Sequence, residues 1–189
     1  NISNDKKLFN LLIIGSVPLI LVGYIFYSTG IVNSFRNLKV IAWTTLIFGI
    51  LMYFADTFKV KKNIENDLTI KNILIIGILQ ILAIVPGVSR AGITITAGRF
   101  LNFDRHDSAK ISFYLSIPAL MGASVLSLKD AVYENLEFNF LLIVSILLSF
   151  IFSYLTIKYF LIYIKNFTLL AFIIYRIILS FILFYIIYI

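Results

Sequence analysis

The sequence contains no cysteine, only one histidine and few charged residues. The absence of cysteine excludes disulfides and thiolate metal sites, and a single histidine excludes sites built from several histidines. Charged residues make up 13% of the chain and hydrophobic residues 61%, whereas a soluble domain has about 25% and about 45–50%. We therefore expect an all-α membrane protein whose 189 residues form a single membrane domain.

The charge balance is basic, with 16 Lys and Arg against 9 Asp and Glu and a net charge of +7. A basic balance can indicate nucleic-acid binding. Here, however, most basic residues lie in short loops between apolar runs, as in membrane proteins with positively charged loops. The expected partner is the bilayer, and no nucleic-acid partner is expected.

Five apolar runs are long enough to cross a membrane, whose hydrocarbon core needs about 20 helical residues. They are roughly 8–27, 38–54, 108–128, 139–160 and 168–188. The fold expected from this pattern is a polytopic helical membrane protein with about five transmembrane helices.

A sixth apolar segment, 72–99, is broken near its centre by Pro86 and Gly87. Each half is about 13 residues long and too short to cross alone. The segment is therefore either one long kinked span or a re-entrant helix pair that enters and leaves on the same side.

The distribution of basic residues distinguishes these two topologies. A re-entrant pair places eleven basic residues on one side and three on the other, whereas a spanning segment places seven on each side. Cytoplasmic loops carry an excess of Lys and Arg, so the pattern favours the re-entrant pair with the eleven-residue side in the cytoplasm. The eleven are Lys6, Lys7, Lys59, Lys61, Lys62, Lys71, Arg99, Arg105, Lys110, Lys158 and Lys165, and the three are Arg36, Lys39 and Lys129.

The residues directly after the break favour an anion. Ser89 is a good N-cap, and the helix that follows it presents unpaired N–H groups and the positive end of its dipole. Arg90 adds a planar fork of donors that fits phosphate oxygens. The pattern therefore predicts a phosphate site at the break. The alternative is a proline-kinked helix in which Arg90 is only structural.

Three other polar features leave two interpretations each. The stripe Ser108, Ser112 and Ser116 either packs closely against another helix or lines a polar path. Arg176, eight residues into the last span, is either a second phosphate ligand or pairs with backbone carbonyls. His106 is either a base or part of a solvated turn.

Residues 86–95, PGVSRAGITI, resemble the PG-x-SRSG-x-T signature of the undecaprenyl-diphosphatase family, the bacitracin-resistance phosphatases. The similarity continues through 11–26, 103–124 and 154–180, so it covers nearly the whole chain. Ala91 departs from the signature, since the family usually has Ser there, and one hydroxyl contact is lost.

The resemblance implies a phosphatase of the bacterial inner membrane that converts undecaprenyl diphosphate to undecaprenyl phosphate during cell-wall precursor recycling. The polyprenyl diphosphate lipid is then the substrate. The oligomeric state is left open, with a homodimer as one alternative. The residues assigned to catalysis are Arg90, Ser89 and Thr94, and those assigned to substrate binding are Gly87, Gly92, Arg176 and Ser112.

The resemblance also implies a divalent cation, Mg²⁺ or Ca²⁺, and two inverted repeats whose re-entrant tips meet near mid-membrane. All nine carboxylates lie in loops or flanks, so no metal ligand is identifiable in the chain. The family's first motif, with a glutamate pair, serines and a histidine, has no counterpart here. We therefore expect the chain to be the C-terminal two-thirds of a longer family member.

Two other classes of function fit parts of the pattern. A transporter or flippase of an anionic lipid also uses broken helices whose N-termini hold anions at the midplane. A non-catalytic scaffold would use the motif only for packing.

Overall fold

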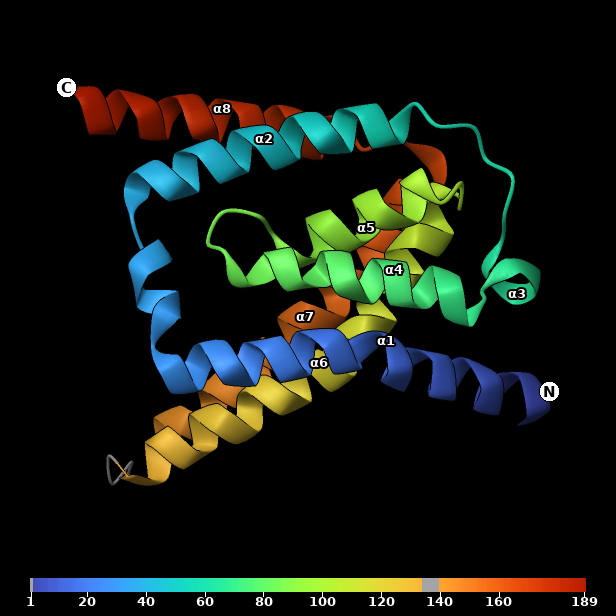
Figure 1. Ribbon diagram of the computed structural model, residues 1–189, viewed down its shortest axis with the longest axis horizontal. Coiled ribbons are helices and arrows are strands. Elements are labelled where there is room, and N and C mark those ends of the chain that lie inside the picture. Colours follow the sequence, from blue (N-terminus) through green and yellow to red (C-terminus); the bar gives the residue numbers. More distant parts are fainter. Residues whose placement is uncertain (1, 134–139) are drawn as a thin grey trace.

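The computed structural model of the protein describes residues 2–133 and 140–189, and every regular element in these two ranges is helical (Figure 1). The 3₁₀ helices are η1 (Ile31–Phe35) and η2 (Ile81–Ile84). The α-helices are α1 (Ile2–Thr29), α2 (Leu38–Asp56), α3 (Ile64–Asp67), α4 (Ile70–Gln80), α5 (Arg90–Phe100), α6 (Arg105–Tyr133), α7 (Phe140–Asn166) and α8 (Leu170–Tyr188). Residue 139, where we predicted the fourth span to begin, lies outside the described residues.

In the described part of the chain, five helices are long and apolar enough to cross a membrane, which confirms the predicted multi-pass architecture. The apolar spans are Lys6–Thr29, Leu38–Asp56, Arg105–Lys129, Phe140–Asn166 and Leu170–Tyr188. The first helix is longer than the apolar run predicted, because it also includes the polar residues that precede Leu8. Polar residues continue a helix readily where its end reaches water.

The segment between α2 and α6 forms a helical hairpin. Its first arm is α4 with η2, its second arm is α5, and the two arms pack against each other (Figure 1). Both arms have their outer ends on the side of the molecule where α3 lies, and the tip between them points toward the opposite side. This arrangement confirms the predicted re-entrant pair.

The hairpin is held by close helix crossings that depend on glycine. A Cβ on Gly77 of α4 would overlap the carbonyl oxygen of Gly15 in α1. A Cβ on Gly98 of α5 would lie 2.7 Å from the hydroxyl of Ser108 in α6. Small residues allow backbones to approach in a membrane, where packing drives helix association. Burial of Ser108 and Ser112 between α5 and α6 favours close packing for the serine stripe.

The re-entrant topology predicts which loops face the same side. Because the chain has no native cysteine, Lys61→Cys, Lys165→Cys and Arg36→Cys can each be labelled alone with an impermeant thiol reagent. We expect positions 61 and 165 to react from the same side of the membrane and position 36 from the other. Labelling of 61 and 165 from opposite sides would mean that the hairpin spans.

Candidate anion-binding site

The tip of the hairpin combines a strained turn with a capped helix start. Gly87 has φ +88° and Ser89 has φ +67°, a region that costs a non-glycine residue about 1–2 kcal/mol. The N–H of Gly92 donates to the Ser89 hydroxyl at 3.2 Å, so Ser89 caps α5 as predicted. Strain of this kind persists only where surrounding structure enforces it, and it is enriched at functional sites.

The carbonyl groups of the tip are held by side chains from two spans. The hydroxyl of Thr44 in α2 donates to the Pro86 carbonyl at 2.7 Å, and that of Thr45 donates to the Gly87 carbonyl at 3.3 Å. The guanidinium of Arg176 in α8 also donates to the Gly87 carbonyl, at 2.7 Å. The sequence analysis missed both threonines. Adjacent hydroxyls inside an apolar span were the available signal, because such groups need buried partners.

Two glycines of the signature allow these contacts to form. A Cβ on Gly87 would overlap the Thr44 hydroxyl and lie 2.7 Å from the Ile41 carbonyl. A Cβ on Gly92 would lie 2.9 Å from Nη1 of Arg176. Gly87 therefore allows the tip to dock on α2, and Gly92 allows the Arg176 guanidinium to reach the start of α5.

Arg90 points toward α6 rather than α8. It is half-buried, and its Nη1 lies 3.4 Å from the carbonyl of Ser112. The hydroxyls of Thr94 and Ser112 are fully buried 2.6 Å apart, and Thr94 Oγ1 lies 2.8 Å from the Arg90 carbonyl. The substrate contacts of Thr94 and Ser112 stay predictions. Their positions favour a supporting role for the backbone and side chain of Arg90.

The charges at the tip are not neutralised by the residues that the structure describes. Arg90 and Arg176 donate to backbone carbonyls, and no carboxylate of residues 6–129 and 140–189 forms an ion pair with either. By contrast, Arg99 and Arg105, at the opposite end of the hairpin, both pair with Asp56. Buried charges require compensation, so two uncompensated guanidinium groups beside a helix N-terminus favour a bound anion.

A cavity of about 540 Å³ adjoins this arrangement. It is bounded by α2, α5, α6, α7 and α8 and has the tip at its polar end. Of the seven predicted site residues, four line it: Gly87, Ser89, Gly92 and Arg176. The rest of its lining is largely apolar and aromatic and includes Met52, Ile95, Phe113, Phe160, Phe172 and Leu179. Its size lies in the range of ligand sites, about 300–1,000 Å³.

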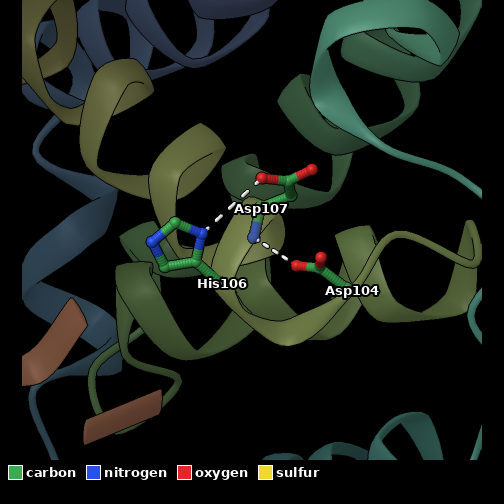
Figure 2. Close-up of side chains that lie close together, drawn as sticks. All are labelled: Asp104, His106 and Asp107. Atoms are coloured by element: carbon green, nitrogen blue, oxygen red, sulfur yellow. Dashed lines mark hydrogen bonds and ion pairs between the residues drawn. The ribbon is translucent and has the colours of Figure 1, made fainter. Parts of the chain in front are cut away.

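The residues around this cavity do not fit a divalent cation, because no carboxylate is among those that line it. Asp104, His106 and Asp107 do bring ligand atoms within 4.8 Å of one another (Figure 2). They lie beyond the far end of α5, however, which is about 15 Å long at 1.5 Å per residue. This cluster therefore cannot hold a metal at the tip.

The acidic cluster is accounted for by helix ends. A carboxylate oxygen of Asp104 accepts the N–H of Asp107 at 2.6 Å, and Asp107 accepts the N–H of Ile64 at 2.8 Å. Nδ1 of His106 lies 3.8 Å from Asp107 Oδ1 (Figure 2). His106 is therefore part of a capped, partly solvated turn, and the structure gives it no contact with the tip.

Comparison with known proteins finds relatives that match most of the chain. Residues 2–182 match the family described as bacitracin resistance protein BacA. The chain is 59% identical over 189 residues to an undecaprenyl-diphosphatase of Pelagibacter ubique (strain HTCC1062), covering 100% of the chain and 74% of the relative. It is 38% identical over 175 residues to that of Alteromonas mediterranea, covering 92% of the chain and 65% of the relative. For the undecaprenyl-diphosphatase of Elusimicrobium minutum the identity is 40% over 175 residues, with coverage of 93% and 66%.

The docking of the tip on α2 predicts a large effect of Gly87→Ala. Gly30 is the matched control, since it also has a positive φ, +69°, but has open space where a Cβ would lie. We expect Gly30→Ala to lower the free energy of unfolding by about 1–2 kcal/mol, the cost of the backbone region. Gly87→Ala should cost about 1–3 kcal/mol more, because its Cβ also overpacks the contact with α2. Thermal unfolding in detergent measures both variants, and equal losses would contradict the docking.

Proposed function

This chain belongs to the BacA family of bacitracin resistance proteins, and on that premise we propose that it acts as an undecaprenyl-diphosphatase of the bacterial inner membrane. The observation that carries the proposal is a tip at which a capped helix N-terminus and Arg176 lie at the polar end of an apolar cavity, while Arg90, at the first residue of α5, faces α6. A lipid diphosphate has the matching chemistry, a polyanionic head on an apolar chain.

The tip would bind the diphosphate through three kinds of donor. The first turn of α5 offers N–H groups that helix geometry leaves unpaired. Arg90 approaches from the side of α6, and Arg176 from the side of α8. Donors that are already positioned stabilise charge that develops on the phosphoryl oxygens without reorganisation at the moment of reaction.

In the reaction, water adds to the terminal phosphorus and the anhydride P–O bond breaks, which gives inorganic phosphate and undecaprenyl phosphate. Arg90, Arg176 and the α5 N-terminus would hold the phosphoryl oxygens during this step. We assign no base among the residues that line the cavity, because none of them is a carboxylate or a histidine. The Mg²⁺ or Ca²⁺ of the family would likewise need ligands from elsewhere.

We propose that the base and the cation ligands belong to the family's first motif, for which this sequence has no counterpart. The chain spans about two-thirds to three-quarters of the relatives named above. The hairpin packs on α1. By contrast, none of the residues in the most apolar 18-residue stretch of α7 is buried, so much of this helix is left uncovered. The face of α7 beside the cavity is therefore where the second re-entrant pair of the inverted repeats would lie.

The transport alternative, which the broken helix also suggested, has no separate support. A transporter would share the anion site, but its relatives would not be expected to carry the diphosphatase name. The hydrolase is therefore the function that we propose.

Substitution of the tip arginines tests the proposal. In a protein that carries the family's first motif together with these residues, Arg90→Ala should lower phosphate release from undecaprenyl diphosphate by about 100- to 1,000-fold, the usual cost of losing one transition-state donor. Arg176→Ala should act similarly and also loosen the tip. Arg36→Ala removes an exposed arginine that does not line the cavity; it is the control and should leave turnover unchanged. Near-normal turnover of the Arg90→Ala variant would contradict the assignment of Arg90 to the diphosphate site.

A further inference from the structure

We propose that Asp56, at the end of α2, is a positioning residue that sets the register of all four helices forming the anion site. Asp56 does not touch the tip, since it lies twelve residues beyond Thr44, about 18 Å along α2. The inference deepens the proposed function, because the site that it serves is the proposed diphosphate site.

The carboxylate of Asp56 connects the ends of three other helices. Oδ1 and Oδ2 accept from Nε and Nη2 of Arg105, at the start of α6, at 2.6 and 3.1 Å. Oδ1 also lies 3.8 Å from Nε of Arg99, in the last turn of α5. Oδ2 accepts the N–H of Leu169, at the start of α8, at 3.4 Å. One side chain thus joins α2, α5, α6 and α8 at a single point.

Each of these helices carries a group of the anion site at a short distance from that point. Arg90 lies nine residues before Arg99 on α5. Ser112 lies seven residues after Arg105 on α6, and Arg176 seven residues after Leu169 on α8. Seven residues are about two helical turns, and a slip of one residue moves a side chain by about 1.5 Å and turns it by about 100°. If one of these helix ends shifted by one residue at Asp56, the hydrogen-bond donors at the tip would therefore be misplaced.

The neighbouring Arg99 makes the junction stiff and dependent on charge. Its guanidinium is 2% exposed and donates to the carbonyls of Phe103, Asp56 and Phe58 at 2.6, 3.0 and 2.5 Å. The side chain of Asp56 is itself only 10% exposed and lies between two arginines. Loss of its negative charge would remove the carboxylate that forms the ion pair with the buried Arg99, which favours rearrangement of the helix ends.

The first test measures the arrangement of the tip without any ligand. Spin labels at Leu82→Cys on η2 and Ile178→Cys on α8 use positions that are 39% and 54% exposed, in a chain with no native cysteine. We expect one narrow distance distribution for the labelled parent and a distribution at least about twice as broad for Asp56→Asn.

The control for this test is Asp67→Asn, since Asp67 lies on the same side of the molecule and its carboxylate accepts a local hydrogen bond, from the N–H of Asn63 at 3.0 Å. It should leave the distribution unchanged. If Asp56→Asn loses helical circular dichroism, Asp56→Glu replaces it, because it keeps the charge and moves the carboxylate by one methylene. An unchanged distribution in a folded Asp56 variant overturns the proposal.

The second test is a double-mutant cycle on binding of inorganic diphosphate to the whole chain. Asp56→Asn should weaken binding about tenfold when Arg90 and Arg176 are present and less than about twofold in the Arg90→Ala, Arg176→Ala double-variant background. Equal losses in both backgrounds would indicate a general loss of stability and overturn the positioning role. If the parent chain binds no inorganic diphosphate, the proposed function fails. The positioning role of Asp56 is then tested by the spin-label distances of the first experiment only.

Discussion

The structure depends on one constraint, the need to satisfy backbone polar groups where the chain breaks inside the membrane. The helical bonds stop at Val85 and begin again at Arg90, so the carbonyls between them need side-chain donors. Thr44, Thr45 and Arg176 supply these donors. The same three contacts bind the tip to α2 and α8, so satisfying the backbone also determines where the α5 N-terminus lies.

These hydrogen bonds satisfy the carbonyl groups of the tip but do not neutralise the positive charge of its arginines. Arg90 and Arg176 donate to neutral carbonyls, whereas Arg99 and Arg105 share the carboxylate of Asp56. Among the described residues, the arginines at the helix ends are therefore neutralised and those at the tip are not. The proposed diphosphate lipid would supply the missing negative charge, and its apolar chain would match the apolar walls of the cavity.

Several parts of the site were readable from the residues because they depend on local backbone chemistry. Pro86 and Gly87 end one helix, and Ser89 begins the next by capping it, as predicted. For Arg176 the sequence left two roles open, and the structure shows the carbonyl contact while its phosphate contact stays a prediction. Thr94 and Ser112 were assigned to catalysis and binding, but the structure pairs their hydroxyls with each other between α5 and α6.

By itself, the sequence determined the membrane class, the five spans, the re-entrant hairpin and the capped start of the helix that follows its tip. These features follow from hydrophobic length, loop charge and the backbone preferences of proline, glycine and serine, all of which act over a few residues. Only the tertiary structure decided which groups meet: the threonines of α2 with the tip, and the ends of four helices at Asp56. Those contacts join residues 42 to 113 positions apart, and helix packing rather than local pattern brings them together.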